Sequence, residues 1–360
     1  MTEIRLRWVV LSACLLLLAA CSESPPVFHD TERPLRLSDW QLFSMDASEF
    51  VPSESSVVFR PNNPLFTDYA HKLRTLWIPG GLQAEIVDDE IVYPVGSVLS
   101  KTFYYPRASS TTLAKVADSG LQKIDLNGNQ LIETRLLVRK ADGWDAFPYV
   151  WNDEQTEAFL RVAGASKQVS LLAAGSTDAT DFTYFVPNEN QCAGCHTTVH
   201  PDGDMHPLGA IFSQLNTDQS SALEQMLAYG WLSNTSNFPR TESWQDTTAP
   251  LPERALAYLN MQCGHCHNPE GAADTSGLIL DKSQTLAINR GVCKPPVAAG
   301  GGAGDLRYAI VPGQPEESIL LYRMRSDEPD EMMPELGRSL IHSEGVDLIS
   351  RWIEEMPGAC

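Results

Sequence analysis

The chain has 360 residues, of which 46 are Asp or Glu and 26 are Lys or Arg, giving a formal net charge of −20. Hydrophobic residues make up 43% of the sequence and charged residues 20%, a composition that supports two or three folded domains and excludes disorder for most of the chain. A surface this acidic repels nucleic acid, so we expect no nucleic-acid partner and favour basic-surfaced protein partners.

The N-terminal segment 1–20 has the pattern of an export signal. Arg5 and Arg7 precede an apolar run that ends at Ala20 and is too short for a comfortable membrane span. Leu18-Ala-Ala-Cys21 is similar to the lipobox of bacterial lipoproteins. This resemblance implies that Cys21 is acylated and becomes the first mature residue, so that the membrane contact is made through the N-terminal lipid only. An ordinary signal beside a chance cysteine is the alternative.

The residues after Cys21 predict where the mature chain resides. Ser22 follows this cysteine where inner-membrane retention favours aspartate, so the resemblance implies the periplasmic side of the cell envelope, at the outer membrane. The polar residues 21–34 are predicted to be a tether. No later run is long and apolar enough to span a bilayer.

Residues 35–187 are predicted to form a β-rich, sandwich-like domain. Residues 97–105 alternate apolar and polar side chains, and Asn127-Gly128 is a strong hairpin signal between two strand-like runs. Residues 153–162 have the pattern of a helix capped by Asn152 or Asp153. This domain carries no metal-ligand or nucleophile signature.

Two motifs carry the chemistry of the sequence. Cys192-Ala-Gly-Cys195-His196 and Cys263-Gly-His-Cys266-His267 both have the form C-x-x-C-H, the attachment signature of c-type haem. Two thiols three residues apart on one turn can add to the two vinyl groups of one porphyrin edge, and the following histidine then faces the iron. A zinc site needs no histidine at the fifth position, and no βαβ pattern supports a thioredoxin-like pair. The sequence therefore predicts two covalently attached haem c groups, with His196 and His267 as iron ligands.

Residues 188–249 are predicted to form the first of two small α-helical haem modules, with a helix at 220–229. The sixth iron ligand has several candidates after His196, and we prefer Met205 to the nearby histidines His200 and His206. A vacant sixth position is the alternative, which matters because an open iron binds small molecules whereas a closed one only passes electrons.

Residues 250–360 are predicted to form the second module. A short amphipathic helix at 252–261 delivers the second motif, and a helix at 345–356 carries an apolar face that can cross it. This arrangement resembles the small cytochrome c fold. Met333-Pro-Glu-Leu-Gly resembles the Met-Pro-Pro-Leu-Gly segment of many small cytochromes c, which implies that Met333 is the sixth ligand, with Met332 as runner-up.

Two cysteines remain after these assignments. Cys14 leaves with the signal and Cys21 is assigned to lipid, so Cys293 and Cys360 form an even pair in an oxidising compartment. We predict a disulfide between them, and two free thiols are the alternative.

Several stretches together resemble one family. They are Pro64–Ala70, Pro94–Lys101, Glu133–Arg139, Pro148–Asn152, Asn190–His196, Thr275–Leu278 and Met332–Gly337. There the chain is similar to an uncharacterised family of di-haem cytochrome c lipoproteins, often encoded beside a parallel β-helix protein. The resemblance covers nearly the whole mature chain and is silent on substrate.

The predicted architecture is a multidomain α+β chain, in which a β-sandwich-like domain is followed by two cytochrome c-type modules. We expect a haem-binding electron carrier that serves redox partner proteins. The alternatives are a di-haem peroxidase-like enzyme with an open first haem, and a binding module in which the β-rich domain recognises a partner.

Overall fold

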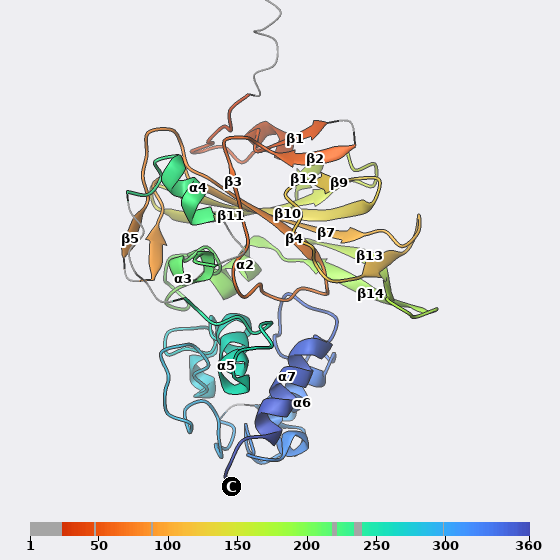
Figure 1. The fold of residues 1–360 in the computed structure, drawn as a ribbon, viewed down its shortest axis with the longest axis vertical. Coiled ribbons are helices and arrows are strands. Elements are labelled where there is room, and N and C mark those ends of the chain that lie inside the picture. Colours follow the sequence, from red (N-terminus) through yellow and green to blue (C-terminus); the bar gives the residue numbers. More distant parts are fainter. Residues whose placement is uncertain (1–23, 47, 88, 218–221, 234–239, 298) are drawn as a thin grey trace, which may run out of the picture.

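The computed structural model describes residues 24–46, 48–87, 89–217, 222–233, 240–297 and 299–360. The predicted signal segment and the predicted lipidation site Cys21 lie outside these residues. Among the described helices, none has the length and apolar character needed to cross a membrane. The chain forms a β-rich part and a smaller helical part, which are stacked along the long axis of the molecule (Figure 1).

The β-rich part is built on a six-stranded antiparallel sheet in the order β12-β11-β10-β7-β4-β3. Its strands are β3 (Val57–Phe59), β4 (His71–Trp77), β7 (Val98–Pro106), β10 (Asn129–Lys140), β11 (Gly143–Trp151) and β12 (Ala158–Leu160). Two three-stranded sheets accompany it, β1-β2-β9 and β14-β13-β8, together with a β5-β6 hairpin. Their strands are β1 (Phe43–Asp46), β2 (Glu49–Pro52), β5 (Glu85–Val87), β6 (Glu90–Val92), β8 (Leu113–Lys115), β9 (Ile124–Asp125), β13 (Ala165–Ala173) and β14 (Ala179–Val186).

Both faces of the six-stranded sheet are buried, because successive side chains of a strand point to opposite faces. Tyr104 of β7 packs in one core with Phe50 of β2. Its neighbour Phe103 packs in a second core with Val169 of β13 and Tyr184 of β14. The predicted mixed α+β chain with a β-rich N-terminal part is thereby confirmed.

Two local predictions in this part are wrong. Residues 153–162 form no helix, because Ala158–Leu160 pairs with the edge of β11 as strand β12. The strands beside Asn127-Gly128 do not pair with each other, because β9 pairs with β2 whereas β10 pairs with β7 and β11. The turn itself is held by the Asp125 carboxylate, which accepts the backbone N–H groups of Asn127 and Gly128.

Residues 188–249 contain α2 (Glu189–His196), α3 (Phe212–Leu215) and α4 (Ala222–Ala228). Phe212, Leu223 and Met226 are buried in the same core as Tyr104 of the central sheet. In the described part of this segment, the structure shows no separate core of the kind that an independent first haem module would need. The boundary at residue 188 stays a prediction.

The C-terminal part contains α5 (Leu251–Gln262), α6 (Ile319–Arg325) and α7 (Ser343–Glu354), which share a third core. Short 3₁₀ helices complete the described helical elements: η1 (Leu37–Trp40), η2 (Asp274–Ser276), η3 (Gly300–Ala303) and η4 (Pro315–Glu317). The helices α5 and α7 cross at Gly345, where a Cβ atom would lie 2.1 Å from the Tyr258 hydroxyl oxygen. A disulfide joins Cys293 to the terminal Cys360.

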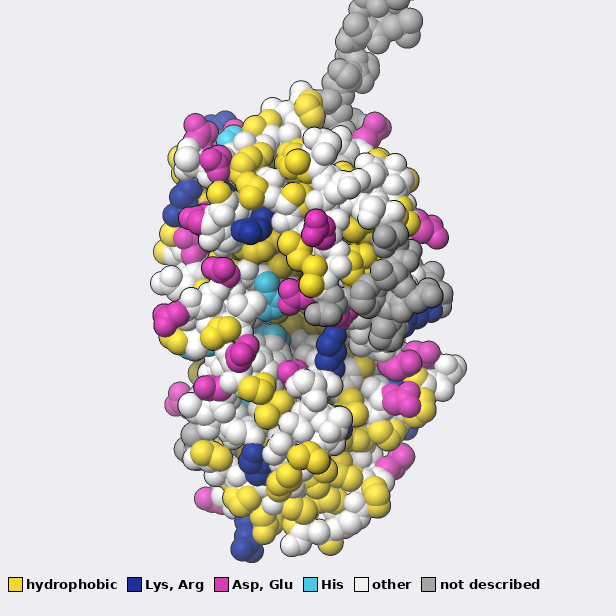
Figure 2. All heavy atoms as spheres, turned by 90° about the vertical axis from the view of Figure 1, so that its left-hand side faces the viewer, with side chains coloured by type: hydrophobic (Ala, Val, Ile, Leu, Met, Phe, Trp, Pro, Cys, Tyr) yellow, Lys and Arg dark blue, Asp and Glu magenta, His cyan; other side chains and the backbone are white. Residues whose placement is uncertain are grey.

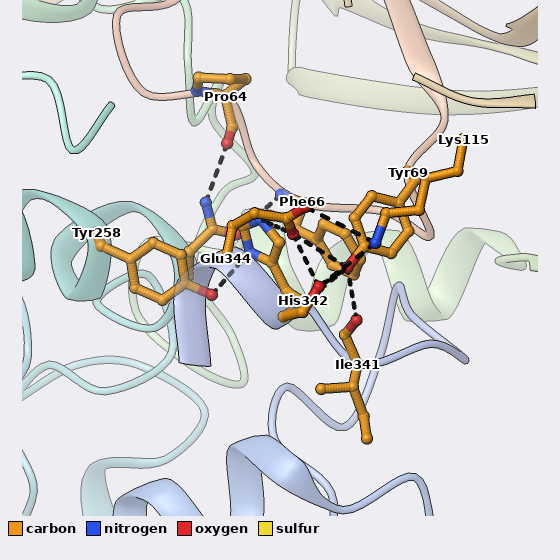
Figure 3. A network of polar contacts seen from close by, with 10 residues as sticks. Pro64, Phe66, Tyr69, Lys115, Tyr258, Ile341, His342 and Glu344 are labelled. Atoms are coloured by element: carbon orange, nitrogen blue, oxygen red, sulfur yellow. Dashed lines mark hydrogen bonds and ion pairs between the residues drawn. The ribbon is translucent and has the colours of Figure 1, made fainter. Parts of the chain in front are cut away.

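A polar and aromatic contact joins the two parts (Figure 3). The His342 ring stacks on Phe66 at 4.2 Å, and its Nδ1 atom lies 2.9 Å from the Tyr258 hydroxyl. Next to it, the Tyr69 hydroxyl donates to the Ile341 carbonyl at 2.9 Å. The Asp68 carboxylate accepts two backbone N–H groups of the C-terminal part, both at 2.7 Å. These bonds fix the helical part against the sheet.

Candidate functional site

The two C-x-x-C-H motifs meet at the junction of the two parts. Sulfur and nitrogen atoms of Cys195, His265 and Cys266 lie within 4.8 Å of one another. The Cys266 sulfur also lies 3.8 Å from the carbonyl oxygen of Gly194, inside the first motif. Tertiary packing therefore places the second cysteines of the two motifs side by side.

Helix α2 positions the first motif. Asn188 caps this helix with its side chain on the Gln191 N–H, and the Gln191 side chain in turn accepts the Asn188 N–H. This reciprocal cap stabilises a helix of eight residues that contains the whole motif. Cys192 and Cys195 are one turn apart and therefore share a face, as attachment to one porphyrin edge requires.

The His196 ring is oriented by a backbone carbonyl. Its Nδ1 atom lies 2.7 Å from the His206 carbonyl oxygen, and the His206 N–H donates to the His196 carbonyl at 2.8 Å. Donation of the Nδ1 proton leaves the Nε2 lone pair for a metal, which is the usual second contact of a metal-bound histidine. Burial lowers the pKa of His196 to about 4, so the ring is neutral at physiological pH, as a ligand must be.

The second motif follows the end of α5. Cys263 caps the helix, and the N–H groups of Cys266 and His267 donate to its carbonyl at 3.1 and 2.8 Å. Gly264 is needed in this turn because a Cβ atom would lie 2.6 Å from the Asn260 carbonyl oxygen. The thiols are thus brought onto one compact turn.

The His267 ring repeats the arrangement of the first motif. Its Nδ1 atom lies 3.1 Å from the Ser276 hydroxyl, which leaves Nε2 free to bind a metal. Burial lowers the pKa of His267 to about 4. Both motif histidines are therefore neutral rings with one nitrogen already engaged.

None of the four motif cysteines forms a disulfide in the structure. Burial raises the pKa of Cys192, and it raises the pKa of Cys263 to about 12. Cys195 and Cys266 share a hydrogen bond, which lowers the pKa of the Cys195 thiol and raises that of Cys266. Two thiols per motif are thus present for covalent attachment.

Two adjoining cavities open at the motifs. The first has a free volume of about 1610 Å³ counted out to open solvent, and Cys192, Cys195 and His196 line it beside the central sheet. The second has about 2010 Å³ and is lined by Cys263, Cys266 and His267. The space open to the centres of water molecules is about 190 Å³ in the first cavity and about 630 Å³ in the second. Ligand pockets typically hold about 300–1,000 Å³, so the second cavity falls in this range and the first is smaller. Figure 2 shows histidine side chains in the hollowed waist between the two parts.

The predicted sixth ligands differ in where they lie. Met333 lines both cavities, and its backbone is fixed by an N–H donated to Arg323 and a carbonyl that accepts from Arg338, both at 2.9 Å. Met332 and Met205 are absent from the lining of either cavity, and Met205 instead forms a β-bridge with Thr197. The ligand roles of Met333 and Met205 stay predictions.

Sequence reasoning missed several residues that line these cavities. Met324 of α6 lines both, but its place in an apolar helix gave it the pattern of a core residue. Lys101 and Arg135 line the first cavity from β7 and β10. For both residues, the sequence feature that could have indicated this role is a positively charged side chain within an otherwise apolar strand.

Comparison with known proteins bears on the second motif. Residues 263–336 match the family described as Planctomycete cytochrome C. The matched segment begins at the first cysteine of the second motif and includes Met333. The match supports a cytochrome c-type family for this segment, and with it covalently bound haem and iron. No curated protein and no solved structure matches the chain.

Proposed function

We propose that this protein is a lipid-anchored, periplasmic di-haem c-type cytochrome that passes electrons between redox partner proteins. The observation that carries the proposal is the shared geometry of the two motifs. Each lines a cavity with two thiols that form no disulfide, and each holds a half-buried neutral histidine whose Nδ1 is engaged and whose Nε2 has no hydrogen bond to the described residues. The cytochrome c match at the second motif supports haem binding and electron transfer.

The residues present fit the cofactor. Haem c, when bound, supplies a one-electron redox centre. Cys192, Cys195 and His196 would hold the first group, and Cys263, Cys266 and His267 the second. Met333 is the proposed sixth ligand of the second iron, a ligation that raises the reduction potential.

The meeting of the motifs supports electron exchange within the protein. Because Cys195 and Cys266 are adjacent, the attachment points of the two groups are adjacent as well. Electron tunnelling weakens steeply with distance, so neighbouring attachment points favour rapid transfer between the centres. The negative net charge of −20 favours docking to basic partners and predicts association rates that fall with salt.

Haem stoichiometry tests the proposal directly. Protein matured with its native export signal should carry two haems per chain by intact mass and by the pyridine haemochrome spectrum. The paired variants Cys192→Ala/Cys195→Ala and Cys263→Ala/Cys266→Ala should each carry one haem, at the remaining motif. The matched double variant of the disulfide pair, Cys293→Ala/Cys360→Ala, should keep two. Wild-type protein without haem, or with haem at one motif only, would contradict the proposal.

Anchoring has its own test. Cys21→Ala, made behind an export signal that is cleaved without lipidation, should move the protein from the membrane fraction to the soluble periplasmic fraction, because the proposed lipid is then absent. A Cys14→Ala variant should stay with the membrane. Equal partition of Cys21→Ala and Cys14→Ala would remove the anchoring proposal.

One observation favours the alternative of a peroxidase-like enzyme. Met205, the preferred sixth ligand of the first iron, does not line the first cavity, so none of the residues chosen for that role from the sequence is shown to close the position. Optical and EPR spectra during stepwise reduction distinguish the two functions. Two low-spin haems in every state indicate a carrier, and a high-spin first haem in the half-reduced state indicates the enzyme.

A further inference from the structure

We infer that the side chains of Arg74, Lys101 and Arg135 form a carboxylate-binding site in the first cavity. The starting observation is the charge of the cavity wall. The described residues that line it include these three cations and Arg338, and none of them is Asp or Glu. In the whole chain acidic residues outnumber basic ones by 46 to 26, so this wall has the opposite sign to the molecule.

The three cations form a row across the central sheet. Arg74 of β4 lies directly opposite Lys101 of β7, and Lys101 lies directly opposite Arg135 of β10. Directly opposed like charges destabilise a sheet. A row of three is therefore costly unless an anion is bound against it.

Among the described residues, one of the three side chains of the row has an anionic partner and the other two have none. Arg135 is engaged by Glu133, with nitrogen–oxygen distances of 2.6 and 2.8 Å. In the part of the chain that the structure describes, Arg74 and Lys101 have no hydrogen bond and no ion pair, although Arg74 is only 6% exposed. The Asp118 carboxylate, which raises the pKa of Arg74, is itself paired with Arg60 at 3.3 Å. A nearly buried guanidinium without a partner is expensive.

The row faces the first motif. Burial, Arg74 and Arg135 hold the pKa of Lys101 well below its usual range, so an anion bound beside the row would favour the ammonium form of this side chain. These cations, Cys192 and His196 all line one cavity. An anion held by the row would therefore lie in the space proposed for the first haem.

The chemistry of the row selects a carboxylate. A guanidinium presents parallel N–H donors that match the two oxygens of a carboxylate, and an ammonium adds a point charge beside it. The carboxylate has two sources, the propionates of a haem attached at Cys192 and Cys195 or a small free carboxylate. We favour the propionates, and this part of the inference rests on the proposed function.

Arg74→Gln and Lys101→Met are the informative variants, because neither substitution leaves a bonded partner unpaired. Arg139→Gln is the matched control, since Arg139 is on β10, its side chain donates to the Lys140 carbonyl, and it does not line the cavity. The measurement is potentiometric titration of the mature holoprotein. The first haem is identified as the component that is missing in Cys192→Ala/Cys195→Ala.

If the row binds propionates, each informative variant should lower the potential of the first haem by about 59 mV, a tenfold change in its redox equilibrium, because loss of a nearby cation favours the ferric state. The second haem and the Arg139→Gln variant should not change. If the source is a free carboxylate, acetate should instead raise the thermal stability of the wild-type holoprotein. Lys101→Met and Arg74→Gln should then weaken acetate binding at least tenfold, with both potentials unchanged.

The inference is overturned if both informative variants match Arg139→Gln in potential and in acetate response. Haem analysis of the wild-type protein separates this failure from that of the proposed function. If the first motif carries no haem, the proposed function fails, and the acetate titration alone decides on the site. If Lys101→Met does not fold, Arg74→Gln makes the same test.

Discussion

The crossing of α5 and α7 makes Gly345→Ala a sharp test of the packing. The added Cβ would lie 2.1 Å from the hydroxyl oxygen of Tyr258 and 2.3 Å from its Cζ, so the ring must move by roughly 1 Å. Overpacking of this kind costs about 1–3 kcal/mol. Loss of the bond between Tyr258 and His342 adds about 1 kcal/mol, and the helix propensity of alanine returns up to about 1 kcal/mol. We expect a net loss of about 1–3 kcal/mol.

Urea unfolding of the holoprotein measures this loss, with Gly80→Ala as the control. Gly80 is exposed, and a Cβ there would meet nothing within 4 Å. Because Tyr258 and His342 also line the first cavity, Gly345→Ala should disturb the spectrum of the first haem before the protein unfolds. An unfolding midpoint equal to that of Gly80→Ala would refute the close crossing.

Three further predictions follow from single contacts. Cys360→Ala opens a loop of 67 residues and should lower the free energy of unfolding by at most about 4 kcal/mol. Added reductant should destabilise the wild type and leave the stability of the variant unchanged. Burial raises the pKa of Asp68 from 3.8 to about 6, so its contribution to stability is full below pH 4 and is lost as the pH rises through 6. Asp68→Asn should therefore gain stability relative to the wild type between pH 4 and pH 7 in urea unfolding, and a constant difference would contradict the buried carboxylate. Ser276→Ala removes the hydroxyl that accepts from the His267 ring, so the imidazole becomes a weaker electron donor to the ferric iron. The reduction potential of the second haem should therefore rise in potentiometry. An unchanged potential would show that this hydrogen bond does not affect the iron.

Local pattern predicted the elements that local forces decide. The alternation of residues 97–105 became β7, and the apolar faces near both ends of the C-terminal segment became α5 and α7. Residues 153–162 failed because the Asn152 side chain accepts N–H groups of Thr156 and Glu157 in a turn, which resembles a helix cap in sequence. Residues 158–160 instead form a strand because they pair with the edge of β11, and this partner cannot be read from the neighbouring sequence.

In the candidate site, too, local sequence determines some features and tertiary packing determines others. The motif cysteines and histidines could be predicted as site residues because one turn of chain contains all their chemistry. The contact of Cys195 with Cys266 could not be found, since it depends on how the helical part docks on the sheet. The row of Arg74, Lys101 and Arg135 is equally invisible in sequence, because strand register alone makes these three neighbours.

The closeness of Cys195 and Cys266 also constrains the order of biosynthesis. In an oxidising compartment, two free thiols at such a spacing form a disulfide readily. That cross-link would engage one of the two cysteines of each motif at once. If haem is attached at both motifs as proposed, this cross-link competes with attachment, and a strain deficient in haem delivery should accumulate a pigment-free species bridged between these two cysteines.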